Sequence, residues 1–174
     1  KQEVDLVLQQ AADRKGIQTS SCGRVLDATA ALLDVCHWRR YEGEPAMKLE
    51  SHARNGKSMD LKPEITWGEP AVLHTSSLLK WLWNQRKINT HDLACTAEAY
   101  LAQGIADIAA EYAHEAHVDM VALAGGCTYN DHLSHIISTR LKQTGLQCIR
   151  NRLVPAGDGG ISYGQAVVAD ARLD

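Results

Sequence analysis

The stretch Val118–Gly126, VDMVALAGG, decides the fold class of this 174-residue chain. It is an apolar run that ends on two glycines, and a segment with helical character, Asn130–Lys142, follows it. A second apolar run, Leu146–Arg150, precedes the glycine-rich loop Pro155–Gly160 and a closing helical segment, Ile161–Leu173. The order strand, turn, helix, strand, turn, helix predicts two parallel strands, because such crossovers are right-handed and return to the same sheet. Both glycine turns then lie at the carboxyl edge of the sheet, where α/β proteins bind ligands.

The rest of the chain is predicted to be mainly helical. Because Val118–Ala124 has few charges, we expect this strand to be covered on both faces. Met59–Trp67 is expected to be a short edge strand, since Pro63 interrupts it. The hydroxyl-rich run Thr19–Ser21 is suited to capping a helix. The expected helices are 4–12 with an end at Lys15-Gly16, 23–35, a helix from Pro45 through Leu49, 76–87, and an alanine-rich helix from Asn89 to about His117.

Composition limits the classes of protein. Hydrophobic residues make up 45% and charged residues 22%, which is typical of a globular chain, and we expect residues 1–174 to form a single lobe. The net charge of −3 argues against broad binding to nucleic acid, and the apolar runs are far too short to span a membrane. The N-terminus is too polar for a signal peptide. Five scattered cysteines without a CxxC pair fit a reduced, cytoplasmic setting.

The two glycine turns carry the first functional hypothesis. Gly125 and Gly126 let the backbone approach a ligand closely, and the helix that follows offers unpaired N–H groups to a phosphate. A tight strand-to-helix turn with no ligand explains the same two residues. Asp158, in the second turn, is placed to bind a divalent metal ion, or else to cap the last helix.

Histidines and one cysteine suggest chemistry less specifically. His114 and His117, and likewise His132 and His135, are spaced three apart on predicted helices, and we expect them on solvated faces rather than as metal ligands. Cys127 follows the glycines, but no base lies at a fixed spacing beside it, so we expect a small packing residue.

Four sequence blocks form a recognisable set. They are Ser20–Ala28 (SSCGRVLDA), Tyr41–Glu44 (YEGE), Leu123–Asn130 (LAGGCTYN) and Val154–Ala166 (VPAGDGGISYGQA). In this order along the chain they resemble the C-terminal part of the hydrogenase maturation carbamoyltransferases of the HypF family. The resemblance covers about residue 18 to the end.

The resemblance implies a fold and an activity. The fold is α/β, the second lobe of an actin/sugar-kinase/Hsp70-like (RNase H-like) architecture, with a small mixed sheet and many helices. The reaction uses carbamoyl-adenylate, which a neighbouring domain makes from carbamoyl phosphate and ATP. The carbamoyl group passes to the C-terminal cysteine of the partner HypE, on the way to the cyanide ligand of [NiFe]-hydrogenase.

The resemblance also implies roles for individual residues. Asp27 matches a helix carboxylate that holds ribose hydroxyls, and Gly43 with Glu42 matches a turn against the nucleoside. The residues that match the nucleotide-binding loops are Gly125, Gly126, Asn130 and Gly159, and the residue that matches a ligand of the active-site metal ion (iron or zinc) is Asp158.

The chain also departs from the family pattern. The family's HxxxH metal pair has no counterpart here, so the remaining metal ligands are expected outside this chain, in the first lobe. We therefore expect the chain to be one lobe of a larger carbamoyltransferase, a fragment or a separately encoded piece. Two other functions stay open: carbamoylation of a small molecule or a tRNA, and a non-catalytic nucleotide-binding or docking lobe.

Overall fold

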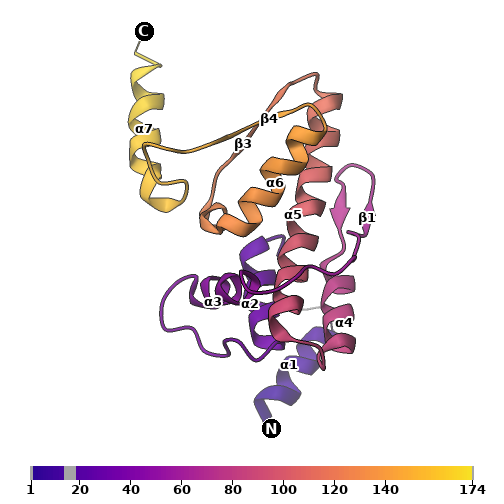
Figure 1. Ribbon diagram of the computed structural model, residues 1–174. Helices are drawn as coiled ribbons and strands as arrows, with labels where there is room; N and C mark the ends of the chain where they lie inside the picture. The colour runs from indigo at the N-terminus through magenta and orange to yellow at the C-terminus, as the bar shows by residue number, and fades with distance from the viewer. Residues whose placement is uncertain (1, 14–18, 174) are drawn as a thin grey trace.

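The computed structural model describes residues 2–13 and 19–173, and one long helix organises them (Figure 1). This helix, α5 (Thr90–Glu115), begins at Asn89, whose side chain accepts a hydrogen bond from the His91 N–H at 2.9 Å. Every residue from Leu93 to Ala102 is buried, so the first half of α5 is covered all round. Its many alanines allow close approach by four other helices, α2 (Cys22–Leu32), α3 (Glu44–Ala53), α4 (Thr75–Gln85) and α6 (Asp131–Gln143).

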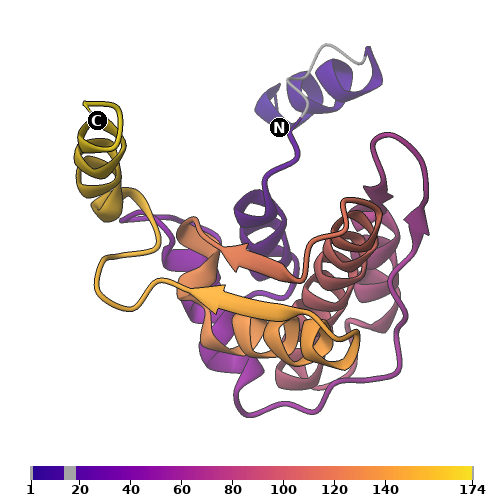
Figure 2. The same cartoon turned by 90° about the horizontal axis from the view of Figure 1, so that it is seen from above.

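The two predicted parallel strands are present. Strands β3 (Met120–Leu123) and β4 (Gln147–Arg150) pair in parallel, from Met120 opposite Gln147 to Leu123 opposite Arg150. Figure 2 shows the strands side by side, with α6 against one face. Gly145 ends the connection from α6 with a φ of 86°, a conformation that favours glycine.

The prediction that this sheet is covered on both faces is wrong for the described residues. Val121 and Leu123 face the core, whereas Met120 is 47% exposed and Ala122 is exposed beside it. Ile149 on β4 is likewise 46% exposed. The small number of charged residues in β3 therefore does not mean that the outer face of the strand is buried within this chain.

The predicted strand Met59–Trp67 is shorter than expected. Its ordered part is β1 (Ile65–Thr66), which pairs antiparallel with β2 (Val72–Leu73). The segment before β1 lies along α5, where side chains one helical turn apart accept its backbone N–H groups. The bonds run from Lys57 to Asp92 at 2.7 Å, from Met59 to Thr96 at 2.9 Å, and from Glu64 to Tyr100 at 3.0 Å. Because α5 satisfies this backbone, it needs no strand partner.

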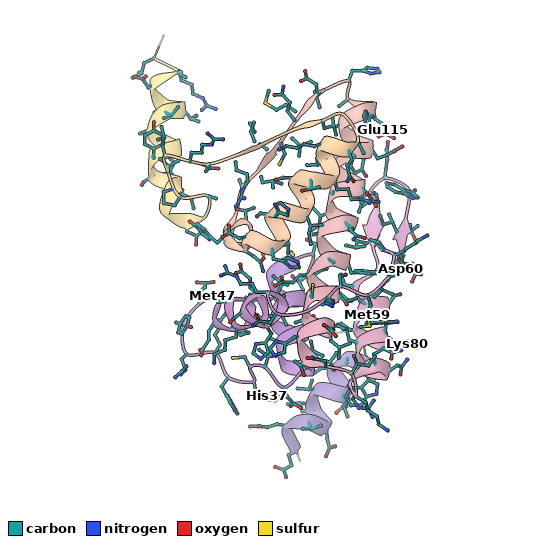
Figure 3. All side chains as sticks on the ribbon, in the orientation of Figure 1. His37, Met47, Met59, Asp60, Lys80 and Glu115 are labelled. Carbon is teal, nitrogen blue, oxygen red and sulfur yellow. The ribbon has the colours of Figure 1, made fainter. Side chains whose placement is uncertain are left out.

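The helices at the two ends of the described chain project from this body. Helix α1 (Gln2–Ala12) and helix α7 (Ile161–Asp170) contain no buried residue. Figure 3 shows the side chains of α7 standing clear of the other elements. The predicted end of the first helix at Lys15-Gly16 lies outside the described residues. Helix α3 continues to Ala53, four residues beyond Leu49, whereas the other helices begin and end within three residues of their predicted bounds, and Ser21 caps α2 as expected.

The fold class is confirmed as α/β, although the small mixed sheet is two separate strand pairs in the described part of the chain. Helices make up most of the remainder. Across residues 2–13 and 19–173, none of the helices combines the length and apolar character that crossing a membrane requires.

Tyr100 provides a test of how α5 holds the β1–β2 hairpin. Its hydroxyl accepts from the Glu64 N–H and donates to the His74 carbonyl at 2.9 Å, and the residue is 1% exposed. Tyr100→Phe should lower the free energy of unfolding by about 1–3 kcal/mol, because it removes two hydrogen bonds that are partly shielded from water.

Tyr112 is the matched control, since its hydroxyl makes the same kind of bonds to Ala71 and Gly68 while the residue is 40% exposed. Tyr112→Phe should cost less than about 1 kcal/mol, because water replaces the lost partner. Urea unfolding measures both, and equal losses would contradict this account.

Candidate functional site

The two glycine turns, which lie far apart in sequence, touch each other. The Gly125 N–H donates to the Ala156 carbonyl at 2.7 Å, and the Gly157 N–H donates to the Tyr129 hydroxyl at 3.0 Å. Gly125 has a φ of 99°, which an L side chain rarely adopts. The carboxyl ends of β3 and β4 therefore carry one continuous rim, as parallel pairing predicts.

The start of α2 lies against the first turn. The Cys127 sulfur lies 3.7 Å from the position that a Cβ atom would take on Gly23. Asp27, one turn further along α2, forms an ion pair with Arg24 at 2.8 Å, and its side chain keeps 20% of its surface exposed. The charges of Asp27 and Arg24 both act on the Cys127 thiol. These observations place Asp27 beside the glycine rim.

A short turn before α6 contributes N–H groups to this rim. A 3₁₀ turn, η1 (Gly126–Tyr129), separates the glycines from α6. Two of the first N–H groups of α6 are already occupied, that of Asp131 by Glu50 at 3.0 Å and that of Leu133 by Asn130 at 2.8 Å. Within the described residues, the N–H groups of Gly126 and Cys127 have no acceptor. The donors available to an anion therefore include N–H groups of η1 as well as what remains free at the start of α6.

Asn130 faces the interior. It is 7% exposed, and its amide donates to the Glu98 carboxylate at 2.7 Å while its oxygen caps α6. His132 binds the other oxygen of Glu98 at 2.7 Å, and Glu98 itself is fully buried. The Asn130 side chain thus holds the rim in place from behind. His114, His117 and His135 are exposed as expected, but the contact of His132 with Glu98 is not a solvated one.

The Tyr41–Glu44 block forms the turn into α3. Gly43 has a φ of 77° at the start of that helix, and Glu42 is exposed. Glu44 is buried, and it accepts from the Arg40 N–H and side chain at 2.7 Å each and pairs with Lys48 at 2.8 Å. This clamp, which sequence reasoning missed, fixes the turn that presents Glu42 and Gly43.

The second glycine turn presents Asp158 to solvent. Asp158 begins η2 (Asp158–Gly160), and its carboxylate makes no capping bond to α7, whose N-cap is Gly160. A Cβ atom on Gly160 would lie 2.3 Å from the Pro155 carbonyl oxygen, so this position requires glycine. Gly159 is exposed beside it. The described residues contain no group of three or more His, Cys, Asp or Glu arranged to hold a metal ion, so Asp158 fits such an ion only as one ligand among several.

Arg150 adds positive charge to the rim, and sequence reasoning missed it. It ends β4, donates to the Thr128 carbonyl at 3.2 Å and lies 3.6 Å from Asp131. The predicted parallel pairing of the two strands could have indicated Arg150, because a residue at the end of β4 must lie near the glycine turn that follows β3. Two hollows on the described surface lie elsewhere, one along α7 around Val168 and one beside the β1–β2 hairpin around Trp67.

Known proteins similar to this chain are carbamoyltransferases. The family model described as the carbamoyltransferase Kae1-like domain, second subdomain, matches residues 1–165. The probable carbamoyltransferase HypF of Methanocaldococcus jannaschii is 35% identical over 154 residues, which cover 86% of this chain and 20% of that protein. The carbamoyltransferase HypF of Rhodobacter capsulatus is 35% identical over 174 residues, covering 98% of this chain and 22% of that protein.

Two solved structures agree with the sequence matches. The crystal structure of T. kodakarensis HypF superposes with a TM-score of 0.84 at 39% identity, over 99% of this chain and 23% of that one. A full-length HypF in a phosphate- and nucleotide-bound form superposes with a TM-score of 0.88 at 30% identity, over 100% of this chain and 23% of that one. The chain belongs to the HypF carbamoyltransferase family, and it spans about a fifth of the length of the two curated relatives.

The Glu44 clamp gives stability a defined pH dependence. Hydrogen bonds from Arg40 and then from Lys48 lower the pKa of Glu44 to about 2. The ionised carboxylate therefore stabilises the fold above its unfolded pKa of about 4.3, and this contribution is lost as the pH falls toward 2. Glu44→Gln should be less stable than wild type at pH 6, and the difference should shrink as the pH falls from 4.5 to 2.

Thermal unfolding at several pH values measures this difference. Glu42→Gln, at an exposed neighbouring carboxylate, is the control and should show no such convergence. A Glu44→Gln deficit that stays constant down to pH 2 would show that the clamp does not depend on ionised Glu44.

Proposed function

We propose that this chain supplies the nucleotide-binding lobe of a HypF-type carbamoyltransferase. Carbamoyl-adenylate binds at the glycine rim, and its carbamoyl group passes to the C-terminal cysteine of a HypE-like acceptor protein. The observation that carries the proposal is the direct contact of the two glycine turns beside Asp27. The remainder of a HypF chain, with its first lobe and its adenylate-forming domain, is the other partner.

Each group at the rim suits one part of an adenylate. The Asp27 carboxylate can accept hydrogen bonds from both ribose hydroxyls. The unpaired N–H groups of Gly126 and Cys127 suit phosphate oxygens, and Arg150 offsets phosphate charge beside them. The neighbouring turns that carry Gly43 with Glu42 and Gly159 are assigned to the nucleoside and phosphate by the family resemblance. The solved HypF in a nucleotide-bound form, which this chain matches along its whole length, supports the assignment.

A divalent metal ion, iron or zinc, completes the proposed site. Bound there, it would polarise the carbamoyl carbonyl as a Lewis acid. Asp158 contributes one hard oxygen ligand, and the other ligands come from beyond the residues described here. Because the metal ligands are divided between this chain and other residues, the chain taken alone is expected to act as a nucleotide-binding or docking lobe that does not catalyse the reaction. The five unpaired cysteines accord with a cytoplasmic setting.

Nucleotide binding tests the rim. Gly126→Val should weaken ATP binding at least about tenfold, because the new side chain fills the space that the rim leaves open. Asp27→Asn should weaken it similarly, since a charge-assisted hydrogen bond is lost. The controls are Gly68→Val, where an added Cβ atom also meets nothing within 4 Å, and Asp34→Asn, beyond the far end of α2.

Isothermal titration of the chain with ATP measures all four variants. Both controls should bind like wild type. If Gly126→Val and Asp27→Asn also do so, the nucleotide lies elsewhere, and if wild type does not bind ATP, this lobe does not hold the nucleotide by itself.

Metal content tests the role of Asp158. The purified chain should hold well under one divalent ion per molecule, because one carboxylate binds such an ion weakly. In a longer HypF polypeptide that includes the first lobe, Asp158→Ala should lower the bound metal, whereas Asp170→Ala on α7 should not. Elemental analysis checks both, and a full equivalent of metal on this chain alone would contradict the division of ligands.

A further inference from the structure

A glutamate lies in the most buried part of the central helix. Glu98 belongs to the stretch Leu93–Ala102 of α5, every residue of which is buried, and its own side chain is fully enclosed. It is outside the four sequence blocks of the family resemblance, and the proposed function gives it no role. Enclosing a carboxylate is costly unless hydrogen bonds replace the lost water, and an apolar residue would avoid that cost. The stability of the core therefore does not explain why a glutamate stands here.

Both carboxylate oxygens of Glu98 are bonded, and both bonds lead to the residues that follow η1. The Asn130 amide donates to one oxygen and the His132 ring to the other, each at 2.7 Å. Because a carboxylate accepts hydrogen bonds, the His132 ring carries a proton on Nδ1. The other ring nitrogen of His132 lies 3.8 Å from the sulfur of Cys95, one helical turn before Glu98. Helix α5 thus holds His132 by both ring nitrogens.

Asn130 links Glu98 to the backbone of η1. The Asn130 N–H donates to the Cys127 carbonyl at 3.2 Å. The hydroxyl of Ser134, one turn further along α6 and fully buried, donates to the Thr128 carbonyl at 2.8 Å. Two carbonyl groups of η1 are therefore bound by Asn130 and by α6, whereas the N–H groups of Gly126 and Cys127 have no acceptor among the described residues. The direction of these N–H groups depends on how Asn130 is held.

We propose that Glu98 is a positioning residue, which fixes the N–H groups of η1 for the phosphate of the nucleotide by holding Asn130. The phosphate rests on the proposed function, whereas the hold on η1 does not. The family resemblance assigns Asn130 to the nucleotide-binding loop, but its side chain is 7% exposed and bonded to Glu98, so it shapes the loop rather than touching the ligand. Donors that are already in place bind an anion more tightly, because binding then has no ordering cost.

Four variants separate the hold on η1 from the helix cap and from the charge. Asn130→Ser keeps a good N-cap for α6 but loses the amide that donates to Glu98. Glu98→Leu removes both hydrogen bonds. Glu98→Gln keeps an acceptor for Asn130, and its amide can donate to the His132 ring once the ring proton moves to Nε2. Asn89→Ser is the matched control, because Asn89 caps α5 by the same kind of bond and is exposed.

Hydrogen exchange measured by mass spectrometry tests the hold on η1 without nucleotide. The N–H groups of Gly125 and Thr128 are bonded, to Ala156 at 2.7 Å and to Gly125 at 3.1 Å. Asn130→Ser and Glu98→Leu should speed their exchange at least about tenfold, with little change in the second half of α5. Glu98→Gln and Asn89→Ser should match wild type at these N–H groups. No increase at the rim, or an equal increase along the whole chain, would overturn the proposal.

Isothermal titration with ATP measures the consequence for binding. Asn130→Ser should raise the dissociation constant at least about tenfold, while the number of sites per chain stays at the wild-type value. A residue that only stabilises the fold would instead lower the number of sites and leave the constant unchanged. Glu98→Gln should keep the constant within about threefold of wild type, since the hydrogen bonds remain.

The outcomes separate the two proposals. If ATP binds Asn130→Ser as tightly as wild type, Glu98 does not position the rim for nucleotide, whatever the exchange rates show. If wild type does not bind ATP but the exchange at Gly125 and Thr128 rises as expected, Glu98 fixes η1 and the assignment of the nucleotide to this lobe by itself is what fails. Asn130→Ser retains the cap of α6, so the test does not depend on whether Glu98→Leu folds.

Discussion

A buried carboxylate holds the candidate site together. Glu98, in the first half of α5, is fully enclosed and accepts one hydrogen bond from Asn130 and one from His132, both at 2.7 Å. A charge buried without such partners would be strongly destabilising. Because Asn130 also caps α6, the position of η1, which lies between β3 and α6, depends on the central helix. The glycine rim is thus fixed from inside the core rather than by contacts on its own surface.

Much of the fold followed from local patterns in the sequence. Two apolar runs, each followed by glycines and a helical segment, predicted the parallel pair of β3 and β4, and the alanine-rich segment predicted α5. The prediction of an edge strand over residues 59–67 was largely wrong because this segment pairs with a helix. Asp92, Thr96 and Tyr100 of α5 take the place of a neighbouring strand as hydrogen-bond acceptors. No pattern within residues 59–67 reveals that contact, since the acceptors lie about thirty-five residues away.

The site was predictable in outline but not in detail. Parallel strands required the glycine turns to meet, and they do. The sequence did not indicate that Asn130 turns inward or that Glu50 accepts a hydrogen bond from the Asp131 N–H, because both depend on which side chains the fold brings beside the helix. Conversely, the motif blocks of the family resemblance gave the family correctly.

The half-covered sheet has a consequence for strand alignment. Side chains alternate along β3 and β4, so a slip of one residue would exchange the inner Val121, Leu123 and Cys148 with outer neighbours such as Met120 and Ile149. Most of these outer residues are apolar too, so the slipped pairing would meet little penalty from burying polar groups. Alignment must instead come from the ends, where Gln147 bonds to Asp119 and Gly125 bonds to Ala156, both at 2.7 Å. The loops that form the rim therefore also keep the two strands from sliding past each other.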